Sequence, residues 1–363
     1  MKLYSRTQHD PSYKLLQLND DILKAIRNGE KLEFKSMDPS SSDVVICGTD
    51  TTWVLKQKNH SNCALVMQKI ISNEGNEKDF ASLNDTSYEY ELTKTPGELN
   101  YNLIPIYDGS SLSGQTTFND LLSNSLCSIG EALKEWHDIG GCIFDNGYIC
   151  KLSDKFITKV LDLMLTSIMA EQLNFQSLNV KEVYYAVQKD SDNIPGDPYS
   201  IPVLTTVLNK FSKTYNEESQ TWELDMGKVT KWYGLVTLRK FTNKKATIEE
   251  TYYPLNHEEF LIKWKSQMPP YFPNTNLEIS ELRGNYFIDF HTGEITYVDK
   301  ATLPGDIKSR LVYLFSLQSQ WELEEIGPLI EDLNVKKAKF ESFLLKYARV
   351  KRLTPKRKVV TPR

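Results

Sequence analysis

Only a few groups of side chains in this sequence have the types and spacing that covalent chemistry requires. The densest group, residues 60–63 (HSNC), places a base, a hydroxyl and a thiol next to one another. A nucleophile is activated by a base within hydrogen-bond reach, and neighbouring side chains on the turn expected here need not converge. His137 and Asp138 fall at the expected end of a helix, where a cation interacts favourably with the helix dipole. Structural roles are sufficient for both groups.

Motifs of nucleotide-dependent and hydrolytic enzymes do not occur in the sequence. It contains no GxxxxGK[ST] phosphate-binding loop, no GxGxxG, no GxSxG and no HExxH. The five cysteines, which lack the spacing of a zinc site, are Cys47, Cys63, Cys127, Cys142 and Cys150. An odd count without a secretion signal is typical of reduced thiols in the cytosol or nucleus. We therefore expect a protein that is not an enzyme and holds no metal or cofactor.

Charge is strongly uneven along the chain. The 363 residues carry a net charge of −5, with the 40% hydrophobic content of a soluble globular protein and no segment apolar enough to span a membrane. Residues 336–363 contain eleven Lys or Arg and a single acid, Glu341, and carry +10, which leaves about −15 for the rest. A basic end on an acidic body indicates a nucleic acid or another acidic partner there. The alternative is a solvated tail that aids solubility.

The basic segment begins with an amphipathic pattern that predicts a helix over residues 336–349. Apolar residues recur at helical spacing from Phe340 to Tyr347. Lys339, Lys346 and Arg349 then lie on the opposite side, as on the DNA-facing helix of a helix-turn-helix unit. The residues predicted to bind DNA, through phosphates rather than bases, are Lys339, Lys346, Arg349, Lys351, Arg352, Lys356, Arg357, Lys358 and Arg363. The alternative is a solvated helix face with a nuclear-localisation run at 356–358.

Residues 1–107 have the pattern of a small β-domain. Short apolar runs, such as 44–47, 53–55 and 64–67, are separated by Asp, Ser, Gly and Asn, which is typical of a barrel or sandwich. Because several runs are short, we expect an incomplete sheet with an open edge, a partial barrel. Residues 108–116 (DGSSLSGQT) are a linker by composition.

After the linker, helical patterns are followed by hairpins. In residues 117–190, two short helical patterns precede Asn146-Gly147, a strong hairpin signal between β-formers, and a long helix follows. Helices followed by a hairpin are typical of a winged helix, and the alternative is a generic α+β fragment. The same order returns in residues 191–304 and 305–363. The predicted fold class is α+β, with an N-terminal β-rich partial barrel followed by three winged-helix domains, the last with the basic tail.

A series of short segments, taken in order, makes the sequence recognisable. They are 11–15 (PSYKL), 53–57 (WVLKQ), 60–62 (HSN), 97–100 (GELN), 105–107 (PIY), 260–266 (FLIKWKS), 317–321 (LQSQW), 328–334 (PLIEDLN), 346–349 (KYAR) and 359–361 (VVT). In order and spacing the chain resembles the family of Dcc-type sister chromatid cohesion proteins from about residue 11 to its last residue. Val350 departs from the family pattern, which has a further basic residue there, and weakens the count of DNA contacts.

The resemblance implies a non-catalytic subunit of an alternative clamp loader, which acts on PCNA in DNA replication and sister chromatid cohesion. In that family, the N-terminal domain forms a joint β-barrel with two chromosome transmission fidelity subunits, and ATP hydrolysis belongs to other subunits of a complex that includes the small RFC subunits. The assembly docks on the catalytic subunit of DNA polymerase epsilon, for which Lys134 and Lys151 in the first winged helix are candidates here. The implied ligands are single- and double-stranded DNA, and the implied localisation is the nucleus.

A free-standing winged-helix transcription regulator is the competing class of protein. It predicts a homodimer and base-reading Arg, Asn or Gln side chains on the recognition helix. The exposed face of residues 336–349 offers Lys and Ser but only one Arg. This composition favours phosphate contact over sequence readout.

Overall fold

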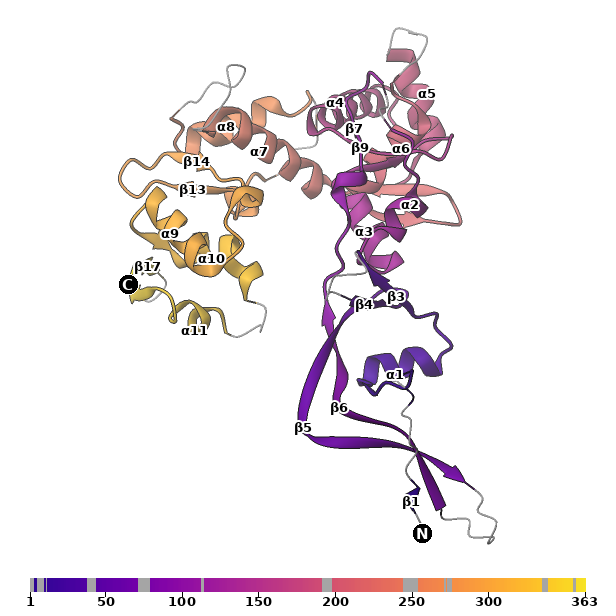
Figure 1. Cartoon of the computed structure of the whole chain (residues 1–363). Coiled ribbons are helices and arrows are strands. Elements are labelled where there is room, and N and C mark those ends of the chain that lie inside the picture. Colours follow the sequence, from indigo (N-terminus) through magenta and orange to yellow (C-terminus); the bar gives the residue numbers. More distant parts are fainter. Residues whose placement is uncertain are drawn as a thin grey trace. The chain divides into compact units, whose positions relative to one another are not determined.

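The computed structural model describes residues 3–4, 10, 12–37, 44–70, 79–111, 114–190, 198–243, 254–270, 272, 276–334, 339–354 and 357–363. The chain forms two compact units, Met1–Leu161 with Asn193–Lys210, and Asp162–Asp192 with Phe211–Arg363. Helices and sheets occur in both units (Figure 1). The predicted α+β class is therefore confirmed.

An open six-stranded sheet forms the N-terminal part of the first unit. Its strands are β1 (Leu3–Tyr4), β2 (Leu16–Gln17), β3 (Glu33–Ser36), β4 (Val44–Cys47), β5 (Thr52–Ile70) and β6 (Asp79–Thr95). Their order is β1-β6-β5-β4-β3, and β2 also pairs with β6. β1 and β2 run parallel to β6, and the other neighbours are antiparallel. The described strands do not close into a barrel, and β3 lies at an edge.

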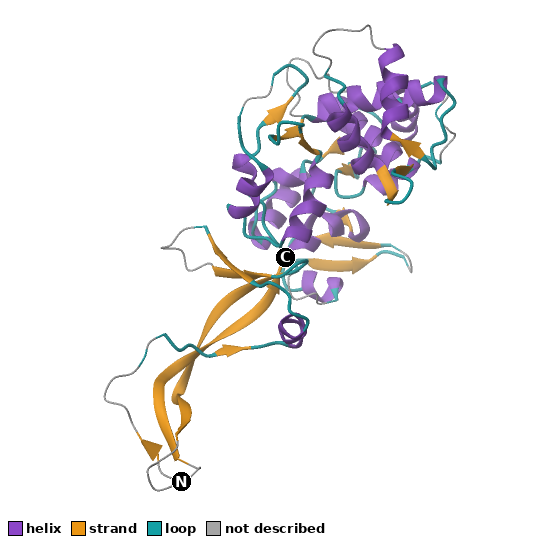
Figure 2. Cartoon of the chain, turned by 90° about the vertical axis from the view of Figure 1, so that its right-hand side faces the viewer, coloured by secondary structure: helices purple, strands orange, loops and turns teal. Residues whose placement is uncertain are grey.

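The long strand β5 corrects the sequence interpretation of this region. The pattern predicts separate strands at 53–55 and 64–67 with a turn at 60–63, but all three segments lie in one strand. Residues 56–65 are exposed and mostly polar, so no apolar alternation marks them as a strand. The ladder to β6 pairs 56–59 and 64–65 instead, and the register is irregular between Asn59 and Ala64. Figure 2 shows the two strands running side by side over most of their length.

Helix α1 (Asp20–Arg27) packs on this sheet. The Asn19 side chain caps the helix by accepting a hydrogen bond from the backbone N–H of Ile22 at 2.9 Å. The apolar face of the helix then buries Ile22, which is 1% exposed, against Ile46 and Trp53. Burial of these side chains is what fixes the helix on the sheet.

Two helices and a three-stranded sheet complete the main body of the first unit. The elements are η1 (Tyr101–Leu103), β7 (Ile106–Tyr107), α2 (Phe118–Ser123), α3 (Ile129–Ile139), β8 (Gly141–Ile143) and β9 (Ile149–Leu152), and the strand order is β7-β9-β8. Capping boxes at Thr117 and Ser128 start the two helices. Gly140, with φ 77°, ends α3 in a left-handed conformation and leads into β8. The predicted hairpin around Asn146-Gly147 is confirmed.

The long helix predicted after this hairpin is α4 (Asp154–Ala170), whose first half belongs to one unit and second half to the other. Its apolar residues at helical spacing, Ile157, Leu161 and Leu165, are all fully buried. It is followed by β10 (Leu178–Asn179), α5 (Val180–Asp190), α6 (Ile201–Phe211), β11 (Ser212–Asn216) and β12 (Thr221–Leu224), with strand order β10-β12-β11.

Two further helices and a hairpin follow in the second unit. They are α7 (Met226–Thr242), α8 (His257–Gln267), η2 (Ile279–Leu282), β13 (Tyr286–Ile288), β14 (Ile295–Tyr297) and η3 (Lys300–Thr302). The indole N–H of Trp264 donates to the Thr230 carbonyl at 3.0 Å and joins α8 to α7. A Cβ atom at Gly234 would come within 2.6 Å of that indole ring, so the close approach requires glycine. The predicted hairpin is confirmed.

The last segment repeats the element order of α4 to β12. It consists of α9 (Ile307–Leu317), β15 (Trp321–Glu322), α10 (Leu323–Ile330), η4 (Glu331–Leu333), α11 (Phe340–Leu344), β16 (Arg349–Arg352) and β17 (Lys358–Thr361), with strand order β15-β17-β16. Trp321 lies in its core, fully buried against Phe287 and Leu344. Asp306 caps α9 by accepting hydrogen bonds from the backbone N–H groups of Lys308 and Ser309.

Candidate nucleic-acid interface

The basic residues of the C-terminal segment gather on the hairpin β16–β17 and on the turn that precedes it. β16 pairs antiparallel with β17, from Arg349↔Thr361 to Arg352↔Lys358. Val360 on β17 is fully buried in the core, whereas Arg349, Lys351 and Arg352 on β16 are exposed. The hairpin therefore anchors one strand in the core and presents the cations of the other to solvent.

The predicted helix over residues 336–349 is wrong at its C-terminal end. Residues 335–338 lie outside the described part of the chain, and α11 spans only Phe340–Leu344. Lys346 lies in the following turn, and Arg349 starts β16. Pairing of Val350 with Val360 extends a ladder beside a buried core position, and this tertiary contact prevails over the local helical pattern.

The nine predicted DNA-binding residues consequently do not form a helical stripe. Lys339 precedes α11, Lys346 lies in the turn, and Arg349, Lys351 and Arg352 lie on β16, all of them exposed. Arg357 and Arg363 are exposed too, and Lys358 is half-buried on β17. Lys356 lies outside the described residues. The structure thus brings five of the nine together on β16 and β17 and their connection, Arg349, Lys351, Arg352, Arg357 and Lys358.

Ion pairs divide these cations into two groups. Arg357 binds the Glu322 carboxylate, and Lys358 binds Glu341 at 2.6 Å. The hydrogen bond from Lys358 holds the pKa of Glu341 below its ordinary value. In the described part of the chain, Lys346, Arg349 and Lys351 have no such carboxylate partner. These three exposed cations are therefore readily available for an external anion.

The other hairpin with the same neighbours, β11–β12, carries no such charge. Its connection contains Glu217 and Glu218, both exposed. The Asn216 side chain closes the turn by accepting hydrogen bonds from the backbone N–H groups of Glu218 and Ser219, at 3.0 and 3.2 Å. The basic surface is therefore a property of the C-terminal hairpin and not of the shared element order.

The two lysines predicted to meet the polymerase lie on different elements of the first unit. Lys134 is exposed on α3. Lys151 is half-buried on β9, the middle strand of its sheet, opposite Gly141 and Ile106. Of the two, Lys134 is the more accessible to a partner.

The side chains considered for catalysis in the sequence lie on a strand and at the end of a helix. His60 lies on β5, where its imidazole Nε2 is 3.1 Å from Glu89, and Cys63 is exposed further along the same strand. Burial lowers the pKa of His137. Among the residues that the structure describes, no three His, Cys, Asp or Glu side chains are grouped to hold a metal ion, and no helix is long and apolar enough to cross a membrane.

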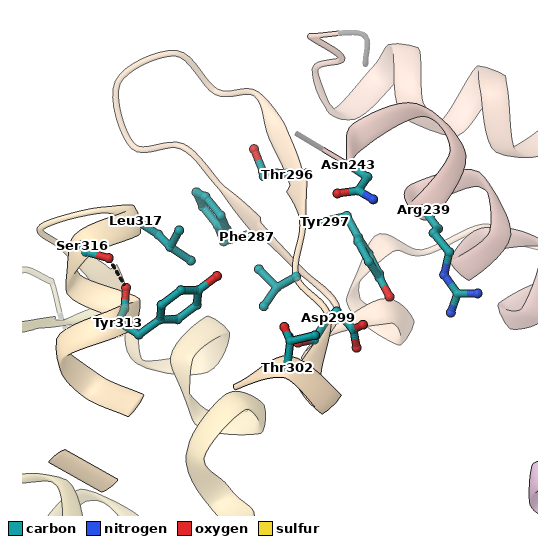
Figure 3. Close-up of a pocket in the computed structure, with 11 residues that line it drawn as sticks. Arg239, Asn243, Phe287, Thr296, Tyr297, Asp299, Thr302, Tyr313, Ser316 and Leu317 are labelled. Carbon is teal, nitrogen blue, oxygen red and sulfur yellow. Dashed lines mark hydrogen bonds between the residues drawn. The ribbon is translucent and has the colours of Figure 1, made fainter. Parts of the chain in front are cut away.

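A cavity of ≈ 470 Å³ in the second unit is not indicated by any sequence motif. It lies between the end of α7, the β13–β14 hairpin and α9. Figure 3 shows Tyr313 and Leu317 on one side and Arg239 and Asn243 on the other. The Arg239 guanidinium lies over the Tyr297 ring, 5.9 Å from its centroid. The lining mixes aromatic and aliphatic side chains with polar ones, and it shares no residue with the basic hairpin.

The described chain thus combines helix–hairpin segments, an open N-terminal sheet and one basic hairpin in an α+β architecture. The family model for the sister chromatid cohesion protein Dcc1 matches residues 13–330. The chain belongs to this family. The basic hairpin lies beyond the matched residues.

Individual relatives agree with this assignment. Sister chromatid cohesion protein DCC1 of Saccharomyces cerevisiae is 41% identical over 391 residues and covers all of both chains. The probable sister chromatid cohesion protein DCC1 of Dictyostelium discoideum is 24% identical, over 95% of this chain and 93% of the relative. The human protein of that name is 22% identical, over 92% and 84%. The yeast alignment includes the basic hairpin.

Proposed function

We propose that this chain is a non-catalytic, nuclear subunit of an alternative clamp loader, which acts on PCNA in DNA replication and sister chromatid cohesion and contacts DNA through its C-terminal hairpin. The observation that carries the DNA contact is the gathering of exposed cations on β16 beside a core-anchored β17. The names of the relatives support the cohesion role. The clamp-loader assignment rests on the resemblance of the ordered sequence segments.

The repeated element order supports winged-helix domains. In both 154–224 and 307–361, a helix, a short strand, two helices and a hairpin follow one another, and the short strand pairs with the last strand. In a winged helix, the hairpin is the wing. The proposal places DNA phosphates at the wing and at the turn after α11, in place of a long recognition helix. The boundaries of the three domains, 117–190, 191–304 and 305–363, stay a prediction, and the repeated segment 154–224 crosses the first of them.

The open N-terminal sheet supports completion of a barrel by partner strands. Leu3 on β1, Phe34 on the edge strand β3 and Leu65 on β5 are 62%, 64% and 56% exposed. An edge strand with exposed apolar side chains is a template for pairing with another chain. We propose that the two chromosome transmission fidelity subunits supply these strands, and that the small RFC subunits join through that complex.

The polymerase contact is proposed for the first unit. The exposed Lys134 on α3 is the favoured residue and Lys151 the second. ATP hydrolysis in the proposed complex belongs to other subunits. This division is consistent with the absence of a phosphate-binding loop from the sequence.

Salt-dependent DNA binding by a double variant tests the proposed interface. We expect Lys346→Ala with Lys351→Ala to weaken binding to single- and double-stranded DNA by roughly 10- to 60-fold at 0.1 M salt and to reduce the slope of log K against log salt by up to about 2, because two phosphate contacts are lost. All DNA sequences should be affected alike. Fluorescence anisotropy on the full chain, at several salt concentrations, measures both quantities.

A matched control replaces two lysines that already have carboxylate partners. Lys189 is 2.6 Å from Glu171, and Lys213 is 3.8 Å from Glu223. The Lys189→Ala, Lys213→Ala variant removes the same charge and should retain affinity and slope. An equal loss in both variants would show a non-specific charge effect and contradict the interface. A strong preference for one DNA sequence would favour the transcription regulator instead.

A further inference from the structure

Thr354 lies at the tip of the β16–β17 hairpin and is followed in the sequence by Pro355. The side chain is exposed, and its Oγ1 accepts a hydrogen bond from the backbone N–H of Arg357 at 3.0 Å. The Thr354 carbonyl accepts from the Nε of Arg352 at 3.4 Å. Oγ1 thus acts as an acceptor in the turn, and among the described residues its own O–H has no acceptor.

The residues around Thr354 have the pattern that proline-directed kinases select. Such a kinase accommodates a proline directly after the target hydroxyl and attracts a basic residue three positions after it with acidic side chains. Pro355 and Arg357 occupy these two positions, and Lys351 and Arg352 add positive charge before the target. We propose that Thr354 is a phosphorylation site for a proline-directed Ser/Thr kinase, and that the phosphate weakens DNA binding by the hairpin. The second part rests on the proposed DNA contact.

The transfer uses ATP bound to the kinase. A bond forms between Thr354 Oγ1 and the γ-phosphorus, and the bond from that phosphorus to the β–γ bridging oxygen breaks, so ADP leaves. The hydroxyl proton passes to the catalytic aspartate of the kinase. The products are phosphothreonine, ADP and a proton.

A second threonine–proline pair in the same hairpin is an internal comparison. Thr361 is followed by Pro362, but it is half-buried and pairs with Arg349 in the ladder. Its neighbours Val359 and Val360 are 1% and 0% exposed. A kinase binds its substrate as an extended segment, so modification of Thr361 requires removal of β17 from the core. Modification of Thr354 requires only the opening of exposed turn hydrogen bonds, a low-energy local opening.

A phosphate at Thr354 acts on the cations that the hairpin offers to DNA. It adds a charge of about −1.5 to −2 at neutral pH and three acceptor oxygens. The Arg352 guanidinium already donates to the Thr354 carbonyl, whereas Arg357 contacts Thr354 through its backbone and its guanidinium binds Glu322. Guanidinium groups bind phosphate through paired hydrogen bonds. The phosphate charge therefore offsets about two cations of the hairpin, and the phosphate competes with DNA for Arg352.

The experiment combines site mapping with DNA titration on the full chain. The chain is incubated with ATP and a cyclin-dependent kinase, and mass spectrometry locates the phosphate. We expect modification of Thr354 and of the conservative variant Thr354→Ser, none at Thr361, and full modification in Thr361→Ala. The phosphorylated chain should bind DNA roughly 10- to 100-fold more weakly at 0.1 M salt, with a slope shallower by about 2. Mock-treated chain and kinase-treated Thr354→Val should keep their affinity.

The outcomes separate this inference from the proposed function. An unmodified Thr354 in the full chain, when a synthetic peptide of residues 348–361 is modified, would overturn the site. A fully phosphorylated chain with unchanged affinity and slope would overturn the regulatory effect. If the untreated chain shows no salt-dependent DNA binding, the proposed DNA contact fails and the regulatory effect with it, whereas mass spectrometry still decides the modification site.

Discussion

The segments 154–224 and 307–361 have the same order of elements and opposite surface charge. In each, the short strand after the first helix pairs with the last strand, Leu178↔Trp222 in one and Trp321↔Val360 in the other. Both segments thus place one tryptophan against one aliphatic residue at this register, but on opposite strands. The hairpin connections differ more, with two glutamates in the first and basic residues in the second.

In these two segments, buried residues set the topology, whereas exposed residues at the hairpin tips set the surface charge. The buried pair at the sheet centre fixes how the hairpin is attached, and either arrangement of the two side chains serves. The exposed tips are free to vary because they contribute little to the core. We therefore expect the ligand of a segment to depend on its hairpin tip. Substitutions in the core, at the buried polar groups and at the tip test this comparison.

The largest effect is expected at the tryptophan. Trp321 is fully buried, and its indole N–H donates to the carbonyls of Leu314 and Gln318 at 3.0 and 3.1 Å. Trp321→Leu should lower the free energy of unfolding of this segment by about 2–4 kcal/mol, because a cavity is left and two carbonyls lose their donor. Hydrogen exchange of the β17 amides, with calorimetry of the full chain, measures the loss.

The matched test gives segment 307–361 the leucine–tryptophan pair of segment 154–224. Trp321→Leu combined with Val360→Trp reproduces the leucine–tryptophan pair and should recover about half of the loss. Trp222→Leu should reduce protection in β12 and leave β17 unchanged. Additive losses in the double variant would mean that the two pairs are not equivalent.

The second-largest change in the free energy of unfolding is expected at the buried polar group that each segment has on its first helix. On α9, Arg310 is 5% exposed, and its NH1 donates to both Asp332 carboxylate oxygens at 2.8 Å and to the Leu329 carbonyl at 3.0 Å. On α4, Asp162 accepts from the Tyr233 hydroxyl. Asp332→Asn should destabilise by about 1–3 kcal/mol at pH 7, because a buried cation loses its counterion while Asp332 itself is partly screened by water.

The pKa shifts of the two carboxyl groups have opposite directions. Burial raises the pKa of Asp162 more than the Tyr233 hydrogen bond lowers it. The contribution of Asp162 to the free energy of unfolding is thus complete below its ordinary pKa, 3.8. It is lost as the pH rises through the pKa that Asp162 has in the folded chain. Burial also opposes ionisation of Asp332, but Arg310 and Lys300 together lower its pKa, so its contribution is present above 3.8 and is lost in more acid solution.

Asp162→Asn and Asp332→Asn should therefore flatten opposite parts of the pH–stability curve. Calorimetry between pH 2 and 7 distinguishes them. In Asp332→Asn the decline on the acid side should become smaller, and in Asp162→Asn the decline above pH 3.8 should become smaller. Identical profiles for the two variants would contradict the assigned environments.

Sequence patterns located most elements but failed where tertiary pairing prevails over local pattern. The Asn146-Gly147 hairpin and the long helix after it follow from local signals and are confirmed. The polar, exposed middle of β5 shows no apolar alternation, and its pairing with β6 on either side of the irregularity between Asn59 and Ala64 is a tertiary contact that no local pattern indicates. The lost end of the helix at 336–349 has the same cause, since Val350 pairs with Val360.

In the candidate site too, some features follow from the local sequence and others only from tertiary contacts. Its location in the C-terminal segment follows from charge alone, which the sequence displays directly. The ion pairs of Arg357 with Glu322 and of Lys358 with Glu341 join residues 35 and 17 positions apart. No periodic pattern indicates such contacts. The distinction between engaged and available cations therefore required the fold.

The smallest effect on stability, and the sharpest test of the comparison, is an exchange of charge between the two tips. Glu217→Lys with Glu218→Lys places two cations on the β11–β12 connection, where both side chains are exposed. The free energy of unfolding should change by less than about 0.5 kcal/mol, because exposed positions contribute little. If element order and tip charge together suffice, this variant should gain DNA affinity, with a slope of log K against log salt that is steeper by up to about 2.

The gain should persist in a chain that also carries Lys346→Ala and Lys351→Ala, because the two hairpins act independently. A stable variant with the affinity and slope of the parent chain would show that the C-terminal hairpin depends on more than its charge, and the arginines that contact the Thr354 backbone would be the first residues to transfer next.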